Sequence, residues 1–442
     1  MPEKAKRNKI GLIGPLTNGN LGNAAFEAAV VQHVRDYFPD AEIYGCCIDS
    51  LETLKNYDVR LFPLNKNIDP SRWLRADGAP ASPQPRILTS EHRLRTLLKN
   101  IPLLRGLVRA ARALLNPVES AGRELRFWLT SYKFLKEFRL LIVRGGGQLS
   151  DGWGGAWNHP YALFTWATLA RLSGTRFVIL SVGADPVSSP LSRWMLTHVL
   201  RSASYHSFRD QSSKKIVEAW GVLDNNHVLP DLAFSLKTPP VHSTASRGRA
   251  GPIVGVSPMP YFDPRVWPVK NAAAYQKYLK TLAAFVCSLI RRGCTIVLFA
   301  SQVRLDPPVL IDLKDLVVGE IGNAETDGLI RETKLCTVDD FLAFIPQIDL
   351  VIASRLHGLL LAQLMYKPAL AISYDHKVDS LMASLGLSEF CLDIRKIDVP
   401  SLTGRFAALE ASRDVIVATL QRRVAEYRAA LQYQYDSVIR PS

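Results

Sequence analysis

The sequence contains none of the cysteine spacings that hold a zinc ion. It has six cysteines, and no two of them form a CxxC pair or belong to a cluster with histidines. We therefore expect no metal site. Most of the six lie in apolar stretches, which is typical of free, buried thiols in a reducing compartment. They are Cys46, Cys47, Cys287, Cys294, Cys336 and Cys391.

Long apolar runs are also missing. No stretch of the sequence approaches the ~18 apolar residues that a membrane-spanning helix needs. The opening MPEKAKRNK leads directly into a strand-like segment, without the apolar stretch of a secretory signal. We expect a cytoplasmic protein whose contact with a membrane, if it has one, is peripheral and on the inner face.

Acidic residues are too few to balance the basic ones. Asp and Glu number 40 against 54 Lys and Arg, and the formal net charge is +14. This balance indicates an anionic partner, either a phosphorylated substrate, a membrane surface or a nucleic acid, although a solvated basic surface gives the same count. No nucleic-acid-binding motif accompanies the charge, and we expect no nucleic-acid partner.

The sequence does contain a repeated alternation of strand-like and helical segments. Its 442 residues are enough for two or three domains with cores of their own. One series covers residues 1–238 and a second covers 252–410, with a polar, basic segment between them. We predict an α/β protein with two Rossmann-like, doubly wound domains facing a cleft, and an amphipathic helix in 411–442.

An insert at about 75–135 interrupts the first series. Within it, residues 86–117 hold seven Lys or Arg and one acid, with apolar residues at helical spacing. Pro102 is placed to start a helix, and Arg105, Arg109 and Arg112 share one face of it. Such a basic amphipathic helix fits an anionic membrane interface, or equally a surface helix packed on the domain.

The most informative stretch is 349–362, with the sequence DLVIASRLHGLLLA. It reads as a buried strand that runs into a helix, and a further strand follows at 369–374, so a parallel pair is expected. Ser354, Arg355 and His357 lie at the junction, where open parallel sheets bind their ligands. An arginine and a histidine at a helix N-terminus predict a site for phosphate or carboxylate.

Three other strand ends carry candidate residues. The loop 14–22 (GPLTNGNLG) is glycine-rich but is neither a Walker A nor a GxGxxG motif. The segment 144–151 (RGGGQLSD) has three glycines that let a backbone approach a ligand, and we favour a cleft-lining role for it. Arg209 follows a short strand as an anion ligand or as the partner of a carboxylate such as Asp210.

Aromatic residues and a histidine follow in GWGGAWNH, residues 152–159. Trp153 and Trp157 are placed to stack on a sugar or line the cleft, or else to belong to the core. His159 is either a general acid or a loop histidine held by its neighbours.

Taken in order, these blocks resemble the polysaccharide pyruvyl transferase family, over roughly residues 9–390 without the insert. The strongest match is the strand-end acid, apolar run, Arg-x-His and helix of 349–362, continuing through 367–374 and Lys377. Supporting matches are GNLG after the first strand, the triple glycine at 145–147, and Arg209 with Asp210.

The resemblance implies two domains in the GT-B arrangement and a transferase reaction. Family members move the enolpyruvyl group of phosphoenolpyruvate onto a hydroxyl pair of a sugar, which forms a pyruvate ketal in envelope or exopolysaccharide precursors. Phosphoenolpyruvate is then a co-substrate, and neither a cofactor nor a metal is expected. The partner is a glycan acceptor, which is lipid-linked if residues 86–117 contact the membrane.

By the same resemblance, Arg355 and His357 hold phosphoenolpyruvate, Arg209 is a further ligand, and His159 is a catalytic candidate. The remaining expected substrate-binding residues are Asn20, Gly22, Gly146, Gly147, Ser354 and Leu356.

The chain departs from the family after Gly22, where Asn23 and Ala24 stand in place of the usual acidic residues. This change puts acceptor choice or activity in question. Two other readings therefore remain open: a GT-B-like glycosyltransferase that uses a nucleotide sugar, and a non-catalytic protein of an envelope-polysaccharide pathway.

Overall fold

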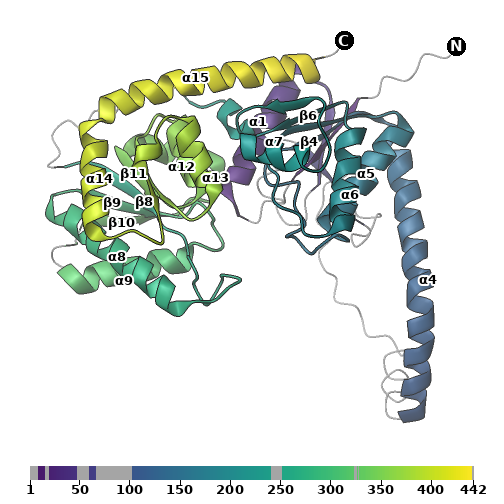
Figure 1. The fold of residues 1–442 in the computed structure, drawn as a ribbon, viewed down its shortest axis with the longest axis horizontal. Coiled ribbons are helices and arrows are strands. Elements are labelled where there is room, and N and C mark those ends of the chain that lie inside the picture. Colours follow the sequence, from purple (N-terminus) through teal and green to yellow (C-terminus); the bar gives the residue numbers. More distant parts are fainter. Residues whose placement is uncertain are drawn as a thin grey trace.

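The protein folds into two α/β lobes, which a long C-terminal helix joins (Figure 1). The computed structural model describes residues 8–14, 19–46, 59–65, 102–239, 251–322, 326 and 328–440; within 102–118 it describes the backbone alone. Most of the predicted linker 239–252, namely 240–250, lies outside the described residues, as does most of the insert before residue 102.

The N-terminal lobe is built on a seven-stranded parallel sheet of order β3-β2-β1-β4-β5-β6-β7. The strand order reverses between β1 and β4, which is where a doubly wound sheet binds its ligand. The strands are β1 (Lys9–Ile13), β2 (Glu42–Cys46), β3 (Val59–Phe62), β4 (Phe138–Arg144), β5 (Arg176–Val182), β6 (Tyr205–Phe208) and β7 (Asn226–Val228).

Helices cover both faces of this sheet. Trp166 is fully buried on one of them, where its ring packs edge-on against Phe62 and Phe127. The helices are α1 (Leu21–Tyr37), α4 (Pro102–Leu135), α5 (His159–Ser173), α6 (Pro190–Ser202) and α7 (Gln211–Glu218), with the 3-10 helix η2 (Leu232–Ser235).

The C-terminal lobe repeats the plan with a six-stranded parallel sheet of order β10-β9-β8-β11-β12-β13. Its strands are β8 (Ile253–Ser257), β9 (Thr295–Phe299), β10 (Ile330–Thr333), β11 (Leu350–Ala353), β12 (Ala369–Ser373) and β13 (Cys391–Asp393). Its helices are α8 (Ala272–Arg291), α9 (Pro307–Ile321), α11 (Val338–Phe344), α12 (Leu356–Leu364), α13 (His376–Ser384) and α14 (Val399–Ala411), with the 3-10 helices η3 (Ile345–Gln347) and η4 (Ser388–Phe390).

The predicted fold class is confirmed, and so is the parallel pair formed by β11 and β12 around α12. The sequence did not reveal α6, α13, α14 or three of the edge strands, β3, β10 and β13. In β10 no residue is buried, so the strand lacks the apolar run that marked the central strands.

Helix α4 begins at Pro102, as predicted, and continues to Leu135. Figure 1 shows its first half extending away from the rest of the lobe, while its second half lies beside α5. The side chains of the predicted basic stretch 86–117 lie outside the described residues, so its membrane contact stays a prediction. Within the described parts of the chain, no helix is both long and apolar enough to span a bilayer.

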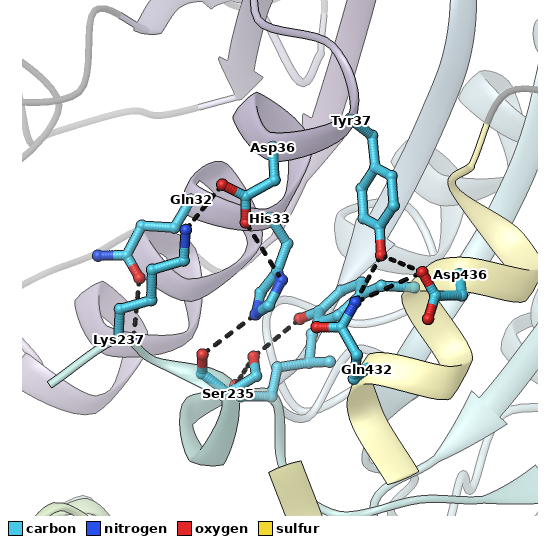
Figure 2. Close-up of polar contacts among 10 residues, drawn as sticks. Gln32, His33, Asp36, Tyr37, Ser235, Lys237, Gln432 and Asp436 are labelled. Carbon is cyan, nitrogen blue, oxygen red and sulfur yellow. Dashed lines mark hydrogen bonds and ion pairs between the residues drawn. The ribbon is translucent and has the colours of Figure 1, made fainter. Parts of the chain in front are cut away.

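Helix α15 (Arg413–Val438) starts on the C-terminal lobe and ends on the N-terminal one (Figure 1). Figure 2 shows how its end meets α1: Tyr37 donates a 2.7 Å hydrogen bond to Asp436, and Gln432 donates one of 2.7 Å to the Tyr37 oxygen. His33 stacks on Tyr435 with ring centres 4.2 Å apart and bonds the carbonyl of Ser235. These contacts fix the end of α15 to the N-terminal lobe.

Candidate functional site

A pocket of about 310 Å³ lies between the lobes. Each residue that lines it belongs either to a loop after the carboxyl end of a strand or to the first turn of the helix that follows. The carboxyl ends of both sheets therefore form its wall, as expected for doubly wound sheets. The N-terminal lobe contributes Asn20, Asn23, Gly146, Gly147, Trp153, Asp185 and Arg209. The C-terminal lobe contributes Ser301, Gln302, Arg355, Leu356, His357, Tyr374, Asp375, Lys377 and Val378.

The GNLG loop joins the two lobes at the pocket. Asn20 caps α1, because its side-chain oxygen accepts hydrogen bonds from the backbone N–H groups of Gly22 (3.0 Å) and Asn23 (3.3 Å). The same loop pairs with the opposite lobe: the Leu21 N–H donates to the Ser301 carbonyl at 3.1 Å. A helix start in one lobe is thereby fixed against a loop of the other.

Gly22 does not line the pocket, but it makes room for His357. A Cβ atom at position 22 would stand 1.8 Å from Cγ of His357, far inside any allowed contact. The histidine belongs to α12 of the C-terminal lobe, and its ring also lies 6.2 Å from that of Phe26 in α1. The glycine that the sequence placed in a ligand loop therefore acts through the histidine.

The imidazole of His357 is kept neutral by its surroundings. Its Nε2 is buried and finds no hydrogen-bond partner among the described residues. Burial lowers the pKa of His357 to about 4; the carboxylate of Asp231 acts in the opposite direction, and the charges of Arg209 and Arg355 lower the pKa further. A buried polar atom without a partner is costly, so a ligand that hydrogen-bonds this nitrogen would be stabilised there.

Arg355 stands at the start of α12 and is held by a carboxylate that the sequence did not reveal. Its Nε and Nη2 lie 3.1 Å and 2.6 Å from Oδ1 of Asp306, a fully buried residue at the start of α9. Asp306 is positioned by a 2.8 Å bond from the Gln302 N–H. The pair orients the guanidinium at the pocket wall, beside the helix N-terminus.

Arg209 lies across Gly183, where an added Cβ would meet its Nε at 3.0 Å. Its guanidinium is 3.5 Å from Asp210 and 3.8 Å from Asp231, which are ion-pair distances longer than hydrogen bonds. The Asp210 carboxylate is engaged elsewhere, as the N-cap of α7 that accepts from the Ser213 N–H at 2.7 Å. Both predicted roles, ion pairing and facing a ligand pocket, are thus compatible with this placement.

Lys377 is a third basic residue of the pocket, and it was not among the site residues predicted from the sequence. Its Nζ lies 2.9 Å from Oδ1 of Asp185, so the ion pair joins α13 of one lobe to the loop after β5 of the other. The available signal was its position shortly after the end of β12, at the start of the next helix, since Arg355 likewise lies between β11 and the helix that follows it.

The triple-glycine loop contributes backbone, as predicted. Gly146 and Gly147 line the pocket, and Gly145 and Gly146 have positive φ angles of 37° and 69°, which other residues adopt only with strain.

Trp153 also lines the pocket, while Trp157 is exposed to solvent outside it. Both tryptophans are exposed, which excludes the alternative that they belong to the core.

Three predicted residues take supporting or neighbouring positions. His159 is buried, does not line the described pocket, and has its Nε2 3.0 Å from Oε1 of Gln148, with the Trp153 ring 5.1 Å away. Ser354 is buried next to the Tyr278 hydroxyl, at 3.2 Å. Leu356 lines the pocket. The placement of His159 favours the reading of a loop histidine held by its neighbours.

We expect His159 and His357 to make the stability of the folded protein sensitive to acid. Burial lowers the pKa of both His159 and His357 to about 4 from an ordinary value of 6.5. Between about pH 6.5 and pH 4, these two histidines are protonated in the unfolded chain but neutral in the folded one. The free energy of unfolding therefore falls as the pH decreases through this range. We expect each histidine to cost about 1 kcal/mol of unfolding free energy between about pH 7 and pH 5.5.

Urea unfolding at the two pH values measures this loss. In His159→Gln, the difference between about pH 7 and pH 5.5 should shrink by about 1 kcal/mol. An unchanged difference would show that His159 is not held neutral in the folded protein.

The described residues contain no group of three or more His, Cys, Asp or Glu side chains arranged to hold a metal ion. Cys287, Cys294, Cys336 and Cys391 are free thiols, and Cys47 lies outside the described residues.

Known proteins share both the sequence pattern and the fold of this chain. The sequence model of the polysaccharide pyruvyl transferase family matches residues 20–376, which is most of the chain and includes all but two residues of the pocket lining. The two are Lys377 and Val378.

Solved structures with the same fold have very different sequences. UDP-GlcNAc 2-epimerase from Neisseria meningitidis bound to UDP-GlcNAc has 10% identity and a TM-score of 0.55, over 98% of this chain and 100% of that one. HepE from Anabaena in complex with UDP has 14% identity and a TM-score of 0.54, over 97% and 100%. The likeness establishes the GT-B-like arrangement of two parallel-sheet domains.

Proposed function

Because the chain belongs to the polysaccharide pyruvyl transferase family, we propose that it transfers the enolpyruvyl group of phosphoenolpyruvate to a hydroxyl pair of a glycan acceptor. The acceptor would be a precursor of an envelope or exopolysaccharide. The observation that carries the proposal is the convergence of Arg209, Arg355 and His357 in one pocket between the lobes.

Phosphoenolpyruvate carries two anionic groups, a phosphate and a carboxylate, and the pocket offers several cationic partners for them. Arg355 and Arg209 approach from opposite lobes, and Lys377 stands at a third position. Arginine binds both groups through paired hydrogen bonds, and the free N–H groups at the start of α12 add a partial positive charge. The donor would thus bridge the lobes.

The proposed chemistry conserves atoms and charge. A proton adds to the methylene carbon of phosphoenolpyruvate, which leaves C2 electrophilic, and one sugar hydroxyl attacks C2. The C2–O bond to phosphate then breaks, and the second hydroxyl attacks C2 to close the ketal. Of the two hydroxyl protons released, one is balanced by the new methyl group and the other leaves with inorganic phosphate. Neither a metal nor a cofactor is needed in this scheme.

His357 is the residue we assign to the phosphate and to proton transfer. In the free enzyme its pKa is about 4, so the ring is neutral near pH ~7. A multiply charged donor bound against Nε2 would raise that pKa, because a nearby anion favours the imidazolium. The histidine would then take up a proton as the donor binds, and hold it where it can serve as a general acid.

Two further residues of the pocket are candidates for contact with the acceptor. Trp153 presents an exposed ring to the pocket and is suited to stack on a sugar. Asn23 also lines it, at the position where the family usually has an acidic residue. An amide in place of a carboxylate keeps the hydrogen-bonding capacity but removes the charge, so we expect this position to affect acceptor choice more than donor binding.

The alternative of a nucleotide-sugar glycosyltransferase has one observation in its favour: both structural neighbours named above were solved with UDP or a UDP-sugar. The test compares the two ligand classes. Purified protein is heated with phosphoenolpyruvate or with a panel of UDP-, GDP- and CMP-sugars. At ~100 times its dissociation constant, a ligand specific for the folded state adds about 2.7 kcal/mol, which for a chain of this length is a rise of about 3 °C in Tm.

We expect that rise with phosphoenolpyruvate and its loss in Arg355→Ala. Arg422→Ala serves as the matched control, because Arg422 pairs with Glu426 on the exposed face of α15. A rise with a nucleotide sugar alone would replace pyruvyl transfer by glycosyl transfer, and a phosphoenolpyruvate response that survives in Arg355→Ala would remove Arg355 from the donor site. Release of inorganic phosphate in the presence of an acceptor would exclude a purely non-catalytic protein.

A further inference from the structure

A solvent-facing set of aromatic and leucine side chains lies on three helices of the N-terminal lobe and on the loop before α5. Trp157 and Trp194 are 71% and 57% exposed, and Leu125 and Leu129 are 63% and 54% exposed. We call this set the α4–α6 apolar face. Its residues are Leu125, Leu129, Trp157, Tyr161, Phe164, Leu191 and Trp194.

The rings of this face form one continuous chain of contacts. Trp157 lies 5.5 Å from Tyr161, Tyr161 lies 6.5 Å from Phe164, and Phe164 lies 5.2 Å from Trp194, all measured between ring centres. The Tyr161 hydroxyl donates a 2.8 Å hydrogen bond to Glu124, which ties the chain to α4. Figure 1 shows α4, α5 and α6 at the same side of the lobe, and α5 packs on both of the others.

The charge around the face is mostly positive. The exposed acids on the described half of α4 and just beyond it are Glu119 and Glu137, and Glu137 pairs with Lys9. Neither α5 nor α6 contains an aspartate or a glutamate, whereas Arg171, Arg193 and Arg201 are exposed on them. Exposed cations continue along the described half of α4 and just beyond it, at Arg123, Arg126, Lys133 and Lys136. The acid at its centre, Glu124, is already bonded by Tyr161 and by the Trp128 indole. An anionic surface would meet this face without a repelling charge on α5 or α6.

We propose that the α4–α6 apolar face docks the protein on the surface of an anionic lipid bilayer. Tryptophan and tyrosine prefer the boundary between lipid headgroups and acyl chains, since the ring is apolar and the N–H or O–H stays hydrated. Leucine side chains enter that boundary with them, and each arginine near the surface gains from anionic headgroups.

The α4–α6 apolar face adjoins the pocket through a single loop. Trp157 and Trp153 belong to one loop between β4 and α5; Trp153 lines the pocket and Trp157 belongs to the face. Membrane docking would therefore bring the pocket close to the bilayer, where an acceptor carried on a lipid is presented. This consequence rests on the proposed function, whereas the docking itself does not.

Co-sedimentation of the full chain with vesicles tests the proposal. Phosphatidylcholine vesicles, either pure or with about one-third phosphatidylglycerol, provide the two surfaces. We expect binding to the anionic vesicles alone, weakened by salt, and at least ~10-fold weaker in Trp157→Ser/Trp194→Ser. The matched control is Leu223→Ser/Tyr433→Ser, two residues that are as exposed but lie on other surfaces and should leave binding unchanged.

Several outcomes would overturn the proposal. One is failure of the native chain to bind anionic vesicles. Another is binding of anionic vesicles by the Trp157→Ser/Trp194→Ser variant that equals binding by the native chain. This includes the case in which deletion of 86–117, and not the double substitution, abolishes vesicle binding. A third is a shift of this variant from dimer to monomer in sedimentation velocity with vesicle binding unchanged, which would assign the face to a second copy. A retained thermal response to phosphoenolpyruvate in the variant keeps this question separate from the proposed function.

Discussion

Gly22→Ala is expected to lower kcat/KM for pyruvyl transfer by ~100-fold or more, because it removes the space that the His357 ring occupies. The added Cβ would lie 1.8 Å from Cγ and 2.1 Å from Cβ of that histidine. Contacts this short cannot be relieved by a small adjustment, so the ring must leave its place or α1 and α12 must separate. Alanine favours the helix at this position, so the loss would not come from helix propensity.

Steady-state kinetics and thermal unfolding of the variant test this expectation together. Gly319→Ala is the matched control, since Gly319 is also helical and an added Cβ meets nothing within 4 Å there. The control should keep full activity and gain up to about 1 kcal/mol in stability. A Gly22→Ala enzyme with native kcat/KM would show that the position of His357 between the lobes is not required for the reaction.

Asp306→Asn is expected to weaken donor binding by ~10-fold or more, although Asp306 itself does not line the pocket. Arg355 uses both Nε and Nη2 to bond one oxygen of this carboxylate, and no other ion pair of Arg355 is found among the described residues. An amide carries no charge, and its NH2 group cannot accept a hydrogen bond. It therefore cannot serve both Arg355 and the Gln302 N–H, and the guanidinium would lose its fixed orientation. Breaking a buried pair also lowers stability, by about 1–3 kcal/mol here.

The kinetic pattern distinguishes positioning from a purely structural role. If Asp306 orients the donor ligand, KM for phosphoenolpyruvate should rise more than kcat falls, and the thermal response to phosphoenolpyruvate should shrink. Asp312→Asn provides the comparison, since Asp312 of the same helix pairs with Arg265 and should reduce stability without altering KM. A drop in Tm with unchanged KM in Asp306→Asn would limit Asp306 to a structural role.

The sequence by itself determined the architecture and the central motif. Runs of apolar residues marked β11 and β12 as buried strands, and the helix between them fixed their parallel pairing. Because ligands of such sheets lie beyond the carboxyl ends of the strands, the amino-acid order alone was enough to place Arg355 and His357 at a site. These properties depend on neighbours within a few residues, which a sequence displays directly.

Only the tertiary structure decided how the site is completed. Gly22 and His357 meet across the lobes, Asp306 is the buried partner of Arg355, and Lys377 pairs with Asp185 over the pocket. Burial likewise separated His159 from the pocket and left Trp157 in solvent. Each of these facts depends on which distant segments pack together. Local hydrophobic periodicity carries no record of that packing, because the side chains that meet belong to different elements whose relative placement the whole fold sets.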